Sequence, residues 1–378
     1  MAINFFSSIN EINLIFKDIY YKLIDIIKSP IDLKISVLPD FFIDRIVKFS
    51  SIDQLTEVIG KKIKVGGGSI RGFNSFDIKG GNAVNVAYCL ANLGVKVDLF
   101  TVADKIGSSI LNTVFEKFKS QVNLHIKNGK HGLTTIFEFS DSSFSVTNVM
   151  LSDIGDNRNF GPTYVESTAV DILHILNSSS AVVLTNWASN LRGTDLLKYV
   201  FKNSSNSIHF LDPADISERR SEFIQDLKNY SKLIDFLSIN ENEYRQIICA
   251  LLNTKGTDIL NNDTEYYTIT PISLCKSALS LSKFFEIELC IHTAIGSVLS
   301  NGYNSVFVKS ISPSKINIVS GAGDSWDSAF LFGHLLNFTN EEKLCFANLV
   351  AFLYLENLYN DSPSLQNIVD YLQNYYLD

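Results

Sequence analysis

The chain is organised around the stretch Ile318–Asp327, whose sequence is IVSGAGDSWD. A strand-like run, 315–319, leads into this stretch, and an apolar-periodic segment predicted to be helical, 326–336, follows it. Its two glycines let a backbone approach a ligand closely, and free N–H groups at a helix start favour an anion. Asp324 places a carboxylate at the same point. The stretch is therefore either an anion cradle with a base beside it, as phosphoryl transfer to a hydroxyl requires, or an ordinary glycine turn.

Composition restricts the class of protein. The 378 residues are 46% hydrophobic and carry a net charge of -8, which argues against a basic nucleic-acid surface. An odd count of five cysteines, none in a Cys-x-x-Cys pair, predicts reduced thiols with no zinc site and no disulfide framework. No apolar run approaches the roughly 20 residues that span a bilayer. We expect a soluble cytoplasmic protein with no nucleic-acid or membrane partner.

The order of predicted elements indicates an α/β fold. From Gly80 onward, strand and helix patterns alternate, which predicts a mainly parallel sheet with helices on both faces. Residues 1–29 have apolar side chains at helical spacing and predict an amphipathic helix that packs on its own body or on a partner. Short strands are predicted at 43–49, 62–65, 134–139 and 144–151, as a small β-rich flap. The polar segment 253–270 is predicted to be a loop.

A second glycine-rich segment opens a predicted helix at 80–85, with the sequence GGNAVN. Its two glycines allow a ligand to reach the first turn, and Asn82 and Asn85 are three residues apart, so both side chains can face one pocket. Amides suit neutral hydroxyls because they offer both donors and an acceptor. The alternative is a glycine bend followed by asparagines that cap the helix.

Polar residues follow several predicted strands. Asn240 and Glu243 begin a helix, either as a capping box or as groups that organise water around Mg²⁺ on nucleotide phosphates. Asp40 and Asp44 lie near the first strand, where a carboxylate can hold sugar hydroxyls or sit in a solvated turn. Asp212 occupies a comparable strand end, where turn initiation is the simpler interpretation.

Two common nucleotide-binding motifs are missing from the sequence. Gly66-x-Gly68 does not continue as Gly-x-Gly-x-x-Gly because position 71 is Arg, and no P-loop sequence occurs. A nicotinamide-dependent dehydrogenase is therefore disfavoured.

The chain resembles the ribokinase-like (PfkB) family of sugar kinases in the order of its motifs. These are an Asp after the first strand, then GGNxxN, Asn-x-x-Glu and GAGD. The resemblance runs from about Ile31 to the C-terminus, and its most specific stretches are 80–94 and 321–333. It implies a three-layer α/β/α fold with a mainly parallel central sheet and a small β-rich lid. The domains would be an N-terminal helical extension, 1–30, and a kinase domain, 31–378. The lid segments would be about 43–75 and 134–150, and the lid often makes dimers.

The resemblance also implies roles for individual residues. Asp324 would be the general base, and Gly321, Ala322 and Gly323 the anion hole for the phosphoryl group. The remaining matches are acceptor-binding positions (Asp44, Gly81, Asn82 and Asn85), positions for ATP (Asn240, Glu243, Thr293, Gly296 and Asn348) and, through water, positions for Mg²⁺ (Asn240 and Glu243).

The chain departs from the family pattern in places. Ile318 and Val319 stand where relatives have Asp-Thr, which helps hold a monovalent cation, so potassium activation is in doubt. Asn82 replaces a lysine common in ribokinases, and Trp326 replaces a usual phenylalanine. The expected function is transfer of the ATP γ-phosphoryl group to a hydroxymethyl group of a sugar or sugar derivative. A nucleoside kinase and a catalytically idle relative that binds sugar or nucleotide are the alternatives, and the sequence leaves the acceptor, and ATP or ADP as donor, open.

Overall fold

The computed structural model describes residues 2–29, 31–140, 146–252, 269–358 and 361–376. Its central element is a ten-stranded sheet. Neighbouring strands are parallel, except that β13 is antiparallel to both of its neighbours. Strands such as β9, with the sequence AVVLT, are apolar throughout because both faces of the sheet are covered. In spatial order the strands are β1 Ala2–Phe6, β14 Asn304–Lys309, β13 Gly296–Ser300, β12 Glu288–Thr293, β11 Phe236–Asn240, β10 Ile208–Asp212, β9 Ala181–Thr185, β2 Lys34–Leu38, β5 Lys96–Ala103 and β6 Val122–Asn128.

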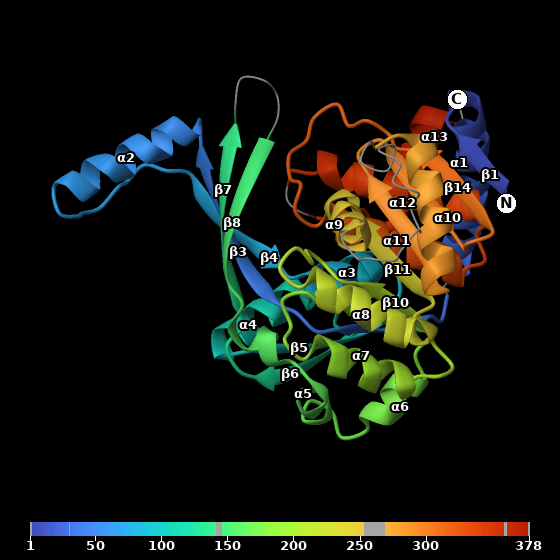
Figure 1. Cartoon of the computed structure of the whole chain (residues 1–378), viewed down its shortest axis with the longest axis horizontal. Helices are drawn as coiled ribbons and strands as arrows, with labels where there is room; N and C mark the ends of the chain where they lie inside the picture. The colour runs from blue at the N-terminus through green and yellow to red at the C-terminus, as the bar shows by residue number, and fades with distance from the viewer. Residues whose placement is uncertain (1, 30, 141–145, 253–268, 359–360, 377–378) are drawn as a thin grey trace.

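Helices cover both faces of this sheet, each above its own hydrophobic core (Figure 1). One face carries α1 Ile9–Lys28, α3 Asn82–Asn92, α4 Lys105–Val114, α11 Ala322–Leu335, α12 Asn340–Glu356 and α13 Leu365–Tyr376. The other face carries α5 Pro162–Glu166, α6 Ile172–Asn177, α7 Gly193–Lys202, α8 Arg220–Tyr230, α9 Glu241–Leu252 and α10 Pro271–Phe285. Short 3-10 turns occur at η1 Glu116–Phe118, η2 Gly155–Asn159 and η3 Ser231–Leu233. The predicted three-layer α/β/α fold is confirmed; most of the predicted loop 253–270 lies outside the described residues.

A separate four-stranded sheet stands beside the main body (Figure 1). Its order is β4 Ser75–Gly80, β3 Phe42–Phe49, β7 Gly132–Ser140 and β8 Val146–Asp153. The predicted small β-rich lid is therefore present, although residues 141–145 lie outside the described part. One face of this sheet buries Asp44, Ile46, Thr134 and Ile136.

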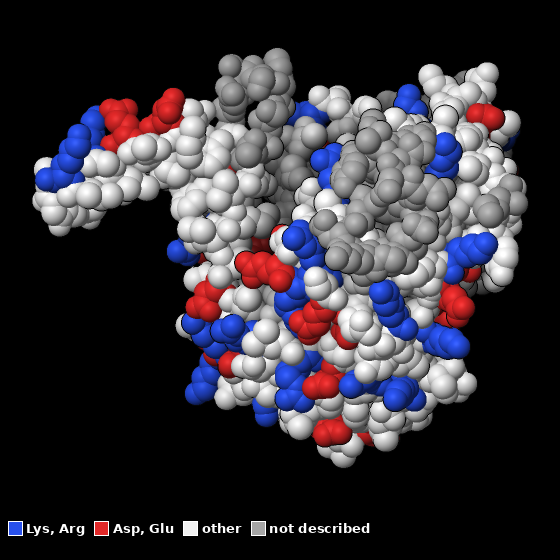
Figure 2. Space-filling model, in the orientation of Figure 1, with Lys and Arg blue, Asp and Glu red and all other residues white. Residues whose placement is uncertain are grey.

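The predicted strand at 62–65 is wrong, because these residues belong to the end of helix α2, Ile52–Lys64, and the turn after it. Ser51 caps the helix through its side chain, and Ile52, Leu55 and Ile59 recur at helical spacing. The glycines from 66 to 68 mark the end of this helix rather than the end of a strand. None of its residues is buried, and it projects as an arm from the lid (Figures 1 and 2).

The N-terminal segment differs in part from its prediction. The amphipathic helix forms as α1, and Phe16, Ile19 and Leu23 are buried against α12 and α13 of the same chain. Residues 2–6 do not continue this helix; they form β1, which pairs in parallel with β14 at the edge of the main sheet. Among the described residues, no helix has the length and apolarity to cross a membrane.

Candidate active site

The GAGD turn joins the segment after β14 to the N-terminus of α11. Gly321 has φ of 93°, a conformation that favours glycine. A Cβ at this position would lie 2.4 Å from the Tyr354 hydroxyl oxygen, so glycine is also required for space. The Ala322 N–H bonds the Val319 carbonyl at 3.2 Å. The N–H groups of Gly323 and Asp324 lie in the first helical turn, which has no preceding helical carbonyls to accept them, so they can face an anion.

Asp324 is buried beside this turn, with 6% of its surface exposed. Its Oδ2 accepts a hydrogen bond from the Asn85 amide at 2.9 Å. Its other carboxylate oxygen makes no hydrogen bond to the described part of the chain. Burial, followed by the charge of Asp212, holds the pKa of Asp324 well above its usual range. The carboxylate is thus oriented, short of compensating charge, and suited to accepting a proton.

The segment 80–85 begins α3, and its cap comes from elsewhere in the chain. Asp40 accepts hydrogen bonds from the backbone N–H groups of Asn82 at 2.9 Å and Ala83 at 3.0 Å. Thr185 and Asn186 donate to the same carboxylate at 2.8 and 3.0 Å. Because Asp40 performs the capping, the side chains of the two asparagines are free to point elsewhere, and Asn85 reaches Asp324.

Asp44 lies on the inner face of the lid and rests on Gly80. A Cβ at Gly80 would lie 2.3 Å from the Asp44 carboxyl carbon, so the close approach requires glycine. Burial raises the pKa of Asp44 to about 6, against a hydrogen bond with Thr134 that lowers it. The structure therefore places this predicted acceptor residue next to the glycine pair at the start of α3.

Lys79 is a buried lysine near the start of α3 that no motif in the sequence indicates. It precedes Gly80 on β4, and its ammonium lies 4.5 Å from the centroid of the Tyr88 ring. Burial lowers the pKa of Lys79 to about 8, while Asp361 and Asp324 act against that shift. In the sequence, Lys79 is marked only by its position directly before the glycine pair. The direction of its side chain depends on the register of the lid strands, which the sequence does not reveal.

Two further buried carboxylates lie behind the GAGD turn. Asp212 accepts from the Asn82 amide at 3.2 Å and from the Ala214 backbone N–H at 2.9 Å, so it both initiates a turn and reaches the site. Asp327 accepts from the Ser238 hydroxyl at 2.5 Å. Burial raises the pKa of Asp212 to about 6 and holds that of Asp327 well above its usual range, with Asp212 adding to the effect. No motif in the sequence indicated a role for Asp327.

Asn240 and Glu243 form the predicted capping arrangement. The Asn240 backbone N–H and side-chain amide each donate to the Glu243 carboxylate at 2.7 Å, and the Asn240 side-chain oxygen accepts from the N–H groups of Asn242 and Glu243. Burial, then the charge of Asp212, raises the pKa of Glu243 well above its usual range.

These residues fit Mg²⁺ only through water. No group of three or more His, Cys, Asp or Glu side chains in the described ranges could hold a metal directly. The oxygens of Asn240 and Glu243 retain lone pairs beyond the bonds they make, and a cation would relieve the repulsion between Glu243 and Asp212. Mg²⁺ prefers oxygen ligands and keeps several waters, which agrees with this indirect arrangement.

Of the other predicted nucleotide positions, Thr293 and Gly296 lie on the neighbouring strands β12 and β13, and Asn348 lies on α12. The Thr293 hydroxyl donates to the Gly296 carbonyl at 2.8 Å, closing the turn between β12 and β13. Asn348 on α12 is buried, and its side-chain oxygen accepts from Ser297 and from the Trp326 indole, both at 2.9 Å. The Asn348 amide thus links β13, α11 and α12, and its predicted role beside adenine stays a prediction.

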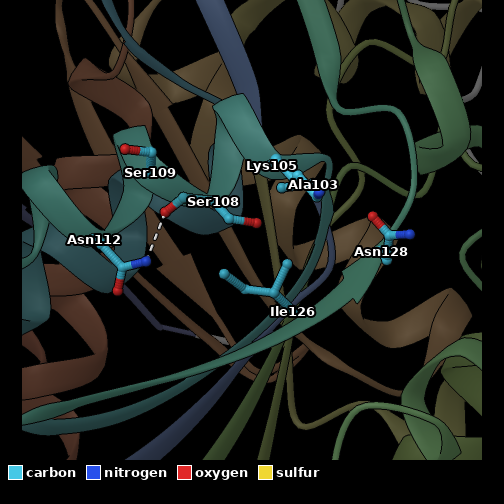
Figure 3. Close-up of a pocket in the computed structure, with 7 residues that line it drawn as sticks. All are labelled: Ala103, Lys105, Ser108, Ser109, Asn112, Ile126 and Asn128. Atoms are coloured by element: carbon cyan, nitrogen blue, oxygen red, sulfur yellow. Dashed lines mark hydrogen bonds between the residues drawn. The ribbon is translucent and has the colours of Figure 1, made fainter.

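An open depression of about 490 Å³ lies away from these groups, between α4 and the edge strand β6 (Figure 3). Lysine, serine and asparagine residues line it together with Ala103 and Ile126, and the side chain of Asn112 bonds the Ser108 carbonyl of its own helix at 2.8 Å. None of the site residues described above lines it: the lining consists of Ala103, Lys105, Ser108, Ser109, Asn112, Ile126 and Asn128.

Comparison with known proteins identifies the family of this chain and the solved structures that share its fold. Residues 77–365 match the pattern of the pfkB family carbohydrate kinase. Among solved structures, adenosine kinase from Sinorhizobium meliloti is 17% identical with a TM-score of 0.65, and the match covers 92% of this chain and 99% of that one. Arabidopsis thaliana ribokinase complexed with ribose and ATP is 17% identical with a TM-score of 0.64, covering 91% and 99%. A probable sugar kinase from Rhizobium etli is 15% identical with a TM-score of 0.67, covering 92% and 99%. No curated protein matches this sequence.

Proposed function

Because this chain belongs to the pfkB family of carbohydrate kinases, we propose that it transfers the γ-phosphoryl group of ATP to a hydroxymethyl group of a sugar or sugar derivative. One observation carries the proposal. The Asp324 carboxylate is held at the first turn of α11 by Asn85 at 2.9 Å, and its second oxygen is left without a hydrogen bond to the described chain. A carboxylate beside N–H groups at a helix start provides both a proton acceptor and an anion site.

The reaction follows from these two features. The acceptor hydroxyl gives its proton to Asp324, its oxygen bonds to the γ-phosphorus, and the bond from phosphorus to the leaving oxygen of ADP breaks. Negative charge on the phosphoryl oxygens is stabilised by N–H groups of the turn 321–324, which are already oriented. Bound Mg²⁺ would neutralise charge on the nucleotide phosphates, and Asn240 and Glu243 would hold its water shell. Ile318 and Val319 offer no charged ligand, so the proposed mechanism includes no monovalent cation.

The acceptor would bind between the lid and the start of α3. Asp44 comes from the lid and Gly81, Asn82 and Asn85 from the start of α3, and carboxylates and amides bind hydroxyl groups well. The concentration of buried carboxylates supports a neutral, hydroxyl-bearing acceptor, because an anionic one would be repelled.

Substitution of Asp324 tests the proposal. We expect Asp324→Asn to lower kcat by about 10²- to 10⁴-fold, the usual contribution of a general base, while nucleotide affinity measured by calorimetry stays nearly unchanged. Asp370→Asn, at an exposed residue of α13, is the matched control and should leave both quantities unaltered. Near-wild-type phosphorylation by the Asp324 variant would rule out the assignment of the base.

Alternative functions are separated by assays of the wild-type protein. Similarity to an adenosine kinase keeps a nucleoside acceptor open, and a ribokinase in complex with ADP is another structural neighbour. A panel of sugars and nucleosides, each with ATP or ADP, identifies the acceptor class and the donor. A catalytically idle relative would bind nucleotide or sugar without turnover for any member of the panel.

We also propose that the chain acts in the cytoplasm, where ATP is supplied, and that it forms a homodimer through the lid. The support for the dimer is the exposed apolar surface on the lid, where Val149 and Leu151 are 47% and 60% exposed. Such surface on a soluble kinase is expected to be covered by a partner.

A further inference from the structure

His292 is a candidate phosphate-contacting residue beside the GAGD turn. It lies at the carboxyl end of β12, where its Cα pairs with Asn240 on β11 and with Ser297 on β13. A Cβ on Gly323 would lie 3.2 Å from His292 Cε1, so the imidazole ring rests against the backbone of the predicted anion hole. The ring is therefore located between the Asn240 position and the turn expected to hold the transferring phosphoryl group.

Neighbouring aromatic rings hold the imidazole in one orientation. Its centroid lies 5.0 Å from that of Trp326, at an interplanar angle of 27°. Trp326 in turn stacks on Phe330 at 5.3 Å and 10°, and its indole N–H is held by Asn348 at 2.9 Å. A ring packed in this way loses little further conformational freedom when it meets a ligand.

The hydrogen-bonding capacity of His292 is unused. Within the described ranges, neither ring nitrogen makes a hydrogen bond or an ion pair, although the residue is only half-buried. The polar side chains next to it are all engaged: Asn240 with Glu243, Thr293 with Gly296, and Ser297 with Asn348. An imidazole carries one N–H when neutral and two when protonated, so His292 offers a donor in either state.

We propose that His292 donates an N–H hydrogen bond to an oxygen of the γ-phosphoryl group held at the turn 321–324. This inference rests on the proposed kinase function and adds a side-chain donor to the backbone donors of the anion hole. A preoriented donor at this place stabilises charge on the phosphoryl oxygens without having to rotate. The stack on Trp326 keeps the ring plane fixed, so the position of the nitrogens is set before the nucleotide arrives.

Three substitutions separate hydrogen bonding from packing. His292→Phe keeps a flat ring against Trp326 but removes both nitrogens, whereas His292→Asn and His292→Gln each restore an amide donor at a different distance from the backbone. We expect His292→Phe to lower kcat/KM for ATP by about 10- to 100-fold, somewhat less than the loss of a principal oxyanion-hole donor, with KM for the acceptor unchanged. One of the amide variants should recover most of this loss.

Binding measured by calorimetry gives a readout that does not depend on turnover. His292→Phe should weaken a non-hydrolysable ATP analogue about tenfold and leave ADP affinity within about twofold, because only the analogue presents a γ-phosphate. Equal affinities of wild type and His292→Phe for the analogue, with a folded variant, would overturn the inference while leaving the kinase proposal intact. If the wild type binds the analogue but phosphorylates no acceptor, the kinase proposal fails and the affinity ratio still decides the role of His292.

Discussion

Asp44 shows how a single site residue can cost stability. Its carboxyl is 7% exposed, and burial together with the charge of Asp40 raises its pKa to about 6, despite Thr134 and Lys79. Between about pH 4 and 6, the folded protein therefore still holds a proton on Asp44, whereas the unfolded chain has already released it. The stability contributed by the neutral form is present below about pH 4 and is lost as the pH rises through 6. At neutral pH, the ionised Asp44 opposes folding.

Replacing Asp44 with Asn should therefore stabilise the fold in a pH-dependent way. A shift of about two pKa units corresponds to about 3 kcal/mol, so we expect Asp44→Asn to raise the free energy of unfolding by about 1 to 3 kcal/mol at pH 8. The gain should shrink as the pH falls below 6. Urea unfolding at several pH values measures it, and Asp18→Asn on the exposed side of α1 is the control. A gain that is independent of pH would contradict the burial argument.

At the residue scale, the sequence predicted positions that depend on local backbone geometry. Gly321, Gly81 and Asn240 are recognisable because a turn or a helix start requires their residue types in a fixed order. Lys79 and His292 carry no such local signal, because strand register and packing across distant segments determine where each side chain lies. Nothing adjacent to them in the sequence distinguishes a lysine or histidine that faces the site from one that faces solvent.

At the element scale, α1 illustrates what periodicity can and cannot predict. Apolar residues at helical spacing predict the helix, but the same spacing predicts a start before Ile9, where the helix begins. Ser8 and Glu11 form a capping box, with the Ser8 N–H donating to Glu11 at 3.2 Å, and this pair marked the true start. The strand β1 before it has no alternating pattern, so only its pairing with β14 defines it.

The packing of α1 on its own body can be measured with a pair of leucines. Leu23 is fully buried against the core below α12 and α13, whereas Leu14 on the same helix is 67% exposed. We expect Leu23→Ala to lower the free energy of unfolding by about 2 to 5 kcal/mol, the usual cost of a buried cavity. Leu14→Ala should change it by no more than about 0.5 kcal/mol. Equal effects in urea unfolding would mean that α1 is not held by this core.

At the scale of the whole molecule, the layers were predictable but the edges were not. Alternating strands and helices dictate a parallel sheet covered on both faces, because parallel strands need crossover connections. The sequences of β1 and α2 contain no pattern of this kind. Strand β1 joins the edge of the sheet by pairing with β14, about 300 residues away. Helix α2 has no buried residue. Segments that bury little leave a weak pattern in the sequence.

Part of the outer face of the lid is open to solvent. Asp44 and Thr134 point to the buried face, so the next residues along the paired strands, including Thr135 and its partner Leu151, point outward. Val149 lies opposite Phe137 on the same outer face. The α2 arm extends past this sheet, and the space beside the arm is open in Figure 2. This outer face is the surface that the proposed homodimer would cover.

Charged substitutions on that face should separate the dimer into monomers. In a covered interface, lysines at positions 149 and 151 would be buried without partners, at a cost of several kcal/mol. We expect the double variant Val149→Lys, Leu151→Lys to sediment as a folded monomer at protein concentrations where the wild type is dimeric, with a melting temperature that no longer depends on protein concentration. Leu173→Lys on α6, at a residue 46% exposed and outside the lid, should remain dimeric. A wild type that is monomeric at every concentration, or a double variant that dimerises equally well, would refute pairing through this face.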